Sequence, residues 1–81
     1  MTIGESIRKI RQSRGISQVF ITNKLGKSSG WLNNIEKDRR SIGAKELHEI
    51  AEIIGVDVGI FFTDELNAKL NEGLSSTGTD Q

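Results

Sequence analysis

The residues best suited to recognition chemistry lie in the run GKSSGWLNNIEKDRR, at positions 26–40. With about 100° per residue in a helix, Leu32 and Ile35 share one side with Ser28 and Glu36. The opposite side carries small, amide and cationic groups without a carboxylate, at Gly30, Asn33, Asn34 and Lys37. A groove lined with phosphates demands such a face, because phosphates repel a carboxylate.

Catalytic and metal-binding chemistry finds no support in the chain. There is no cysteine, and the single histidine, His48, forms no metal site by itself, so we expect it at the surface. The run GKS at 26–28 lacks the glycine that a phosphate-binding loop needs five residues earlier, where Ile21 stands. We therefore expect no enzyme, no metal or other cofactor, and no small-molecule ligand.

The charges divide between the two halves of the chain, although the formal net charge is zero. Residues 1–40 hold nine Lys or Arg against three acids, a net charge of +6. Residues 41–81 hold two Lys against eight acids, a net charge of −6. This asymmetry favours one end that faces a polyanion. The alternative is that solvated faces differ by chance.

The length and the apolar pattern predict one small cytoplasmic domain. Eighty-one residues cannot support two independent cores. The chain shows neither a charged-then-apolar leader nor an apolar run near 18 residues, so we expect no secretion and no membrane contact.

Caps, breakers and helical spacing predict five helices and no strands. Thr2 and Ser17 can cap the first two helices, and glycines can end them. The expected helical regions are 2–15, 17–26, 28–37, 44–55 and a short fifth helix that begins after Asp57 and holds Phe61. Leu66 and Leu70, four residues apart, allow a C-terminal helical extension.

These elements predict an all-α fold, a compact five-helix bundle. We expect residues 1–74 to form the domain, with a dimerisation element at its C-terminal end. Residues 75–81 contain nothing apolar to bury, so they are expected to be a disordered tail.

The run GISQVFITNKLGKSSGWLNNIEKDRR, followed by LHEIAEIIGVDVGIFF, resembles the helix-turn-helix domain of the lambda-repressor-like, Xre-type DNA-binding family. The resemblance covers residues 3–62. Its motifs are GISQ at the second helix, the LG turn, Ser28 at the cap of the third helix, IE at its end and the closing AxxIGVDVxxFF. It implies a lambda-repressor-like bundle whose third helix enters the major groove of double-stranded DNA.

The resemblance also implies roles for individual residues. Base contacts are expected from Ser29, Gly30, Asn33 and Asn34. Contacts to phosphates and the DNA backbone are expected from Gln18, Lys27, Ser28, Trp31, Lys37, Arg39 and Arg40. Ser29 and Gly30 stand where relatives often carry Gln or Arg. We therefore expect few direct base contacts, with part of the sequence discrimination coming from DNA shape.

Three points stay open at the level of the sequence. Trp31 either packs against DNA or folds back onto the second helix as peripheral core. The resemblance pairs Glu36 with Arg11, but periodicity alone cannot choose between Arg11 and Arg14. Val19 and Phe20, where relatives are typically polar, are either extra core or a second contact surface.

The apolar residues beyond Gly55 exceed what the core needs, and we expect some of them in a homodimer interface: Ile60, Phe62, Leu66 and Leu70. Their alternative role is an intramolecular cap over the core. The expected function is a sequence-specific transcriptional regulator, most simply a repressor, that reads the major groove with residues 29–37 as a dimer on an inverted repeat. A regulatory protein partner could control it. The alternative is a protein-interaction module or antitoxin-type partner with the same fold.

Overall fold

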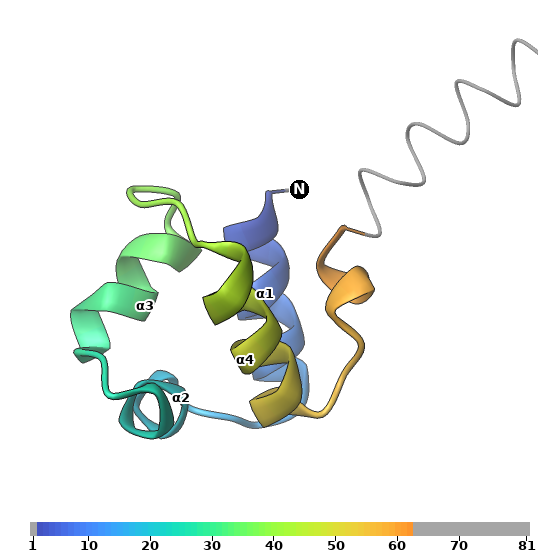
Figure 1. Ribbon diagram of the computed structural model, residues 1–81, viewed down its shortest axis with the longest axis horizontal. Helices are drawn as coiled ribbons and strands as arrows, with labels where there is room; N and C mark the ends of the chain where they lie inside the picture. The colour runs from blue at the N-terminus through green and yellow to red at the C-terminus, as the bar shows by residue number, and fades with distance from the viewer. Residues whose placement is uncertain (1, 63–81) are drawn as a thin grey trace, which may run out of the picture.

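The computed structural model describes residues 2–62 of the 81-residue chain. Four α-helices and one 3-10 helix make up this part, which contains no β-strand. Their bounds are Ile3–Ser13 for α1, Gln18–Leu25 for α2, Ser29–Glu36 for α3, Ala44–Ile54 for α4 and Val58–Phe62 for η1. The predicted all-α fold is confirmed, and the fifth helix is a 3-10 helix (Figure 1).

Part of the predicted organisation lies outside the described residues. This applies to the helical extension with Leu66 and Leu70 and to the tail at 75–81. The boundary of the domain at residue 74 therefore stays a prediction.

The start of α1 follows from its first residues. The Glu5 amide donates to the Thr2 hydroxyl over 3.1 Å, and the Thr2 amide donates to the Glu5 carboxylate over 2.8 Å, which completes a capping box. The hydrogen bond from the Thr2 backbone amide, followed by the Thr2 side chain, lowers the pKa of the Glu5 carboxyl. The Thr2 hydroxyl also donates to Asp38 over 2.9 Å, so the start of α1 is tied to the loop after α3.

A tight turn separates α2 from α3. The Ser17 hydroxyl accepts from the Phe20 amide over 3.1 Å at the start of α2. Gly26 ends the helix in the left-handed region at φ 68°, where glycine carries no steric cost. The Lys27 amide then donates back to the Thr22 carbonyl over 2.9 Å. Because each helix has only eight residues, both depend on packing against the rest of the bundle.

The core takes residues from every element. The buried apolar side chains are Ile7, Ile21, Leu32, Ile35, Leu47, Ile50, Ala51, Ile54 and Phe61. In Figure 1, α1 and α4 occupy the middle of the molecule, α2 and α3 lie on one side, and η1 lies on the other. The bundle therefore holds α3 at one end, away from η1.

Gly4 allows α1 to approach α3 closely, a role that the sequence analysis did not identify. Gly4 is buried, and a Cβ atom added to it would collide with the backbone carbonyl oxygen of Ile35. The backbone of α1 thus contacts the last turn of α3 directly. This contact sets how closely the two helices pack at that point.

Candidate nucleic-acid interface

The outward side of α3 largely follows the predicted pattern. Leu32, Ile35 and Glu36 are buried, whereas Ser29, Gly30 and Lys37 are exposed and Asn33 and Asn34 are half-buried. Ser28 is the exception, because it is exposed rather than grouped with the buried side. It occupies the N-cap position, where the chain is still extended and only begins to turn into the helix.

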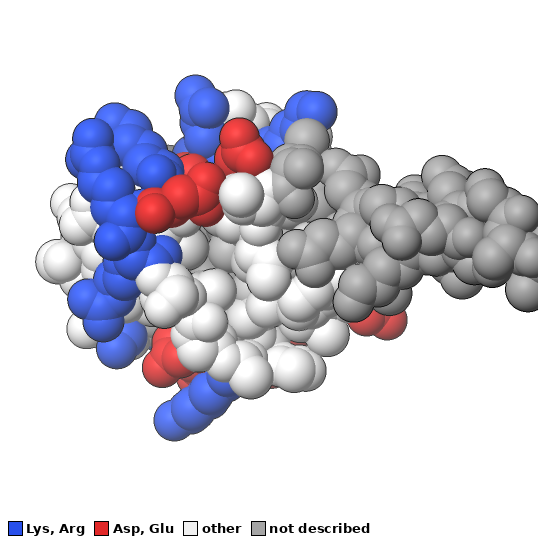
Figure 2. Space-filling model, turned by 90° about the horizontal axis from the view of Figure 1, so that it is seen from above, with Lys and Arg blue, Asp and Glu red and all other residues white. Residues whose placement is uncertain are grey.

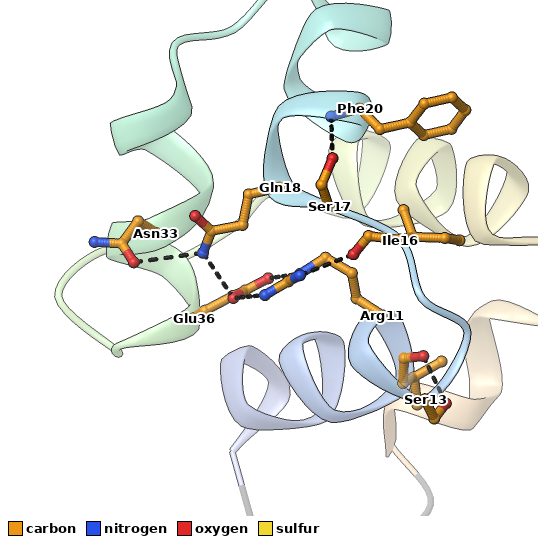
Figure 3. Close-up of polar contacts among 9 residues, drawn as sticks. Arg11, Ser13, Ile16, Ser17, Gln18, Phe20, Asn33 and Glu36 are labelled. Atoms are coloured by element: carbon orange, nitrogen blue, oxygen red, sulfur yellow. Dashed lines mark hydrogen bonds and ion pairs between the residues drawn. The ribbon is translucent and has the colours of Figure 1, made fainter.

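A polar network lies beneath the helix-turn-helix motif (Figure 3). The Arg11 guanidinium donates to both oxygens of Glu36, over 2.8 and 2.9 Å, and to the Ile16 carbonyl over 2.8 Å. The Gln18 amide nitrogen donates to Glu36 over 2.9 Å and to the Asn33 side-chain oxygen over 3.4 Å. The partner of Glu36 is therefore Arg11, and the network joins α1, α2 and α3.

The network orients two amide side chains. A carboxylate only accepts hydrogen bonds, so Gln18 must turn its nitrogen toward Glu36. The same nitrogen meets the oxygen of Asn33, whose own amide nitrogen points away from the network (Figure 3). Both donor positions of the Gln18 side chain are thus occupied in the free chain. Its expected phosphate contact stays a prediction, to be made through its backbone amide or after one of these bonds opens.

The start of α3 is polar and open. Ser28 caps the helix by position, but its hydroxyl makes no capping hydrogen bond, while its carbonyl accepts from the Trp31 amide over 3.0 Å. A Cβ atom added to Gly30 would meet no other atom within 4 Å. The first turn of α3 therefore leaves room for another molecule to approach its backbone.

Trp31 belongs partly to the core. It is half-buried and packs against the buried apolar cluster. The Lys27 ammonium lies 5.4 Å from the centre of its ring, within the range of a cation–π interaction. Trp31 thus packs at the periphery of the core and remains partly exposed, and its contact with DNA stays a prediction.

Four of the predicted backbone-binding residues are cations at the two ends of α3, and all are exposed: Lys27, Lys37, Arg39 and Arg40. The loop turns sharply at Asp38, which has φ 61°, and the Arg39 amide donates to the Asn34 carbonyl over 2.8 Å. Lys and Arg side chains gather in a band on the α3 side of the molecule, with acidic side chains next to it (Figure 2).

A polar hollow of about 370 Å³ opens where α1, α2 and α3 meet. Its lining consists of three cations, one carboxylate and three amides: Arg8, Arg11, Lys37, Glu36, Gln12, Gln18 and Asn33. The sequence analysis did not select Arg8 or Gln12. The helical spacing indicates this grouping, because Arg8 lies three residues before Arg11 and four before Gln12, and residues three or four apart on a helix share a face.

The apolar residues considered for contacts differ in exposure. Val19 and Phe20 are 52% and 47% exposed, so they are not extra core. The Lys24 ammonium lies 5.0 Å from the centre of the Phe20 ring. Ile60 is 40% exposed, whereas Phe62 is half-buried and packs against the core. The predicted dimer interface thus retains one strongly exposed residue within the described part of the chain.

His48 lies at the surface as predicted, and its Nδ1 atom is 2.8 Å from the Ala44 carbonyl oxygen. Among residues 2–62, no three His, Cys, Asp or Glu side chains are grouped so as to hold a metal ion. None of the helices in this range is long and apolar enough to cross a membrane.

Two short helices joined by a tight turn, supported by a buried ion pair and flanked by cations, define a helix-turn-helix domain of the lambda-repressor type. The chain belongs to the helix-turn-helix family, whose model matches residues 7–61. This family comprises DNA-binding regulators rather than enzymes, in agreement with the sequence analysis.

Curated relatives match over most of this chain. It is 36% identical over 73 residues to the HTH-type transcriptional regulator RamB of Mycobacterium tuberculosis, covering 86% of this chain and 15% of RamB. It is 32% identical over 65 residues to the immunity repressor protein of Bacillus phage phi105, covering 80% of this chain and 45% of the repressor. The HTH-type transcriptional regulator PrpR of M. tuberculosis is 32% identical over 77 residues, which cover 95% of this chain and 16% of PrpR. The chain thus spans less than half the length of these relatives. No solved structure matches it significantly.

Proposed function

We propose that the protein is a DNA-binding transcriptional regulator that inserts α3 into the major groove. The observation that carries this proposal is the charge arrangement of α3. Its only acid, Glu36, is buried and paired with Arg11, while the outward side presents small and amide groups between exposed cations. A phosphate-lined groove therefore meets no exposed carboxylate of this helix.

Base reading is assigned to the first turns of α3. Asn34 can make a bidentate contact with adenine, a pair worth about 1–3 kcal/mol of discrimination. Asn33 turns its amide nitrogen outward and can donate to a base-edge acceptor such as guanine O6 or N7. The exposed Ser29 and Gly30 bring the helix backbone close to the groove.

Repression is the simplest regulatory mode, because a protein that occupies a promoter excludes other proteins from it. The phage phi105 relative is an immunity repressor. One α3 helix covers only a few base pairs, so useful specificity calls for a homodimer on an inverted repeat.

Titration onto duplex DNA at two salt concentrations tests the proposal. We expect binding to a random duplex and to promoter-derived duplexes that weakens steeply as salt rises, because Lys and Arg displace counterions from phosphates. Fluorescence anisotropy measures both affinities. Absence of binding to every duplex at low salt would refute a DNA-binding function.

A pair of substitutions tests the division of roles. Arg39→Ala should weaken binding to all duplexes by a similar factor, because a phosphate contact carries no sequence information. Asn34→Ala should abolish discrimination at one base position and leave binding to random DNA nearly unchanged. Selection of bound sequences from a random duplex pool, followed by anisotropy on single-base variants, measures both effects. Equal effects of the two substitutions would contradict this assignment.

The exposed pair Val19 and Phe20 favours a second candidate function, a protein-interaction module. Large apolar side chains exposed next to each other often indicate a contact surface. A chain of this second kind would bind neither duplex in the titration above.

A further inference from the structure

The hollow between α1, α2 and α3 has the charge of an anion site. Three cations and one carboxylate line it, a net charge of +2. The carboxylate, Glu36, is 1% exposed at its side chain, and both of its oxygens accept hydrogen bonds from Arg11, with Gln18 bound to one of them. An anion that enters the hollow therefore meets cations and a carboxylate that is already neutralised.

Two of the cations, Arg8 and Lys37, have N–H donors available for an anion. The side chains of Arg8 and Lys37 are exposed, and neither makes a hydrogen bond or an ion pair with another residue of the described part. Arg11 is held by Glu36 and Ile16, and the donor positions of the Gln18 side chain are occupied. An anion can thus recruit Arg8 and Lys37 without breaking an existing bond.

The position of the hollow indicates which anion it receives. Asn33 and Lys37 line the hollow and also belong to the outward side of α3, so the hollow opens beside the proposed DNA-reading face. With α3 in the major groove as proposed, a DNA strand that borders the groove would pass over the hollow. The volume of about 370 Å³ leaves room for a phosphate group with ordered water.

We propose that this hollow seats one backbone phosphate of bound DNA, with the guanidinium of Arg8 and the ammonium of Lys37 as its hydrogen-bond donors. The inference rests on the proposed function and extends the DNA interface from the helix-turn-helix to α1. The guanidinium can direct two parallel N–H groups at one phosphate, which makes Arg8 the stronger of the two contacts.

Arg8→Ala and Arg14→Ala form a matched pair for the test. Both substitutions remove one positive charge, from the middle of α1 at Arg8 and from its C-cap at Arg14. Both residues are exposed, but only Arg8 lines the hollow. Arg8→Ala should weaken binding to specific and random duplexes about tenfold at low salt, because it removes one charge-assisted contact with a phosphate. It should also reduce the slope of log affinity against log salt by about 0.9, the value for one phosphate contact. Arg14→Ala should leave this slope unchanged. Arg8→Lys keeps the positive charge and should have a slope close to that of the wild-type protein.

Duplexes with single methylphosphonate linkages locate the contact. One neutral linkage per half-site should weaken the wild-type protein and have no further effect on Arg8→Ala. If the wild-type protein binds DNA but Arg8→Ala and Arg14→Ala have equal affinities and salt slopes, the proposed phosphate site is refuted while the proposed function stands. If the wild-type protein binds no duplex, both the phosphate site and the proposed function are refuted.

Inorganic phosphate is the control for a site that takes free anions. Titration followed by ¹⁵N–¹H chemical shifts should show only weak binding around Gln12 and Gln18. Saturation at low phosphate concentration, without any effect of Arg8→Ala on the DNA salt slope, would overturn the proposal in favour of a free-anion site. Circular dichroism of the variants confirms that each retains the helical fold.

Discussion

Glu36 ties α3 to both α1 and α2. Its carboxylate is buried beside the Arg11 guanidinium, and Gln18 and Asn33 complete the same network. Desolvation of both charges offsets much of their attraction, so the pair contributes more to the orientation of the motif than to net stability. The orientation matters because the same bonds set the direction of the Asn33 amide.

We expect Glu36→Gln to lower the free energy of unfolding by about 3–5 kcal/mol, because it leaves the buried Arg11 without a charge partner. Urea denaturation followed by circular dichroism measures the loss. The double variant Arg11→Met with Glu36→Met removes both charges and should recover most of it. An equal loss in the single and double variants would show that the charge pair is not the cause.

At the scale of the elements, side-chain capping bonds mark the starts of α1 and α2 but not those of α3 and α4. Ser17 and Ser28 both stand at an N-cap with extended backbone, yet only Ser17 accepts a capping hydrogen bond from its helix. Substitutions of these two serines can therefore be compared to isolate the contribution of the capping hydrogen bond.

We expect Ser17→Ala to destabilise the protein by about 1 kcal/mol, the usual cost of removing a side-chain N-cap. Ser28→Ala should cost much less, because no capping bond is lost. Urea denaturation compares the two variants directly. A loss in Ser28→Ala as large as that in Ser17→Ala would mean that the Ser28 hydroxyl does cap α3 in solution.

At the scale of the whole molecule, the proposed homodimer needs a surface that a second copy can cover. Two exposed apolar sites compete within the described residues, Ile60 on η1 and the pair Val19 and Phe20 on α2. In Figure 1 these elements lie on different sides of the bundle. A dimer through η1 leaves α2 and α3 available for DNA.

We expect Ile60→Glu to raise the dimer dissociation constant on the order of tenfold or more, because an unpaired carboxylate is costly in an apolar interface. Val19→Glu is the control, and it should leave self-association unchanged. Sedimentation equilibrium over a range of concentrations measures both variants. Dissociation by Val19→Glu alone would place the interface on α2 instead.

Helix positions, caps and the buried face of each helix can be derived from the sequence of this protein. Thr2, Ser17, Gly26 and Gly55 act within a few residues of their own position, so local chemistry suffices. The apolar spacing likewise selects Leu32 and the rest of the core correctly. The resemblance to the helix-turn-helix family rests on these same local features.

Only the tertiary structure distinguishes Arg11 from Arg14 as the partner of Glu36, turns the Gln18 donors inward and groups Arg8 with Lys37 around one hollow. Each of these facts joins residues far apart in the chain; 25 positions separate Arg11 from Glu36. Helical periodicity predicts which side of its own helix a residue occupies. It carries no information on which residue of another helix stands opposite, since that depends on how the helices pack.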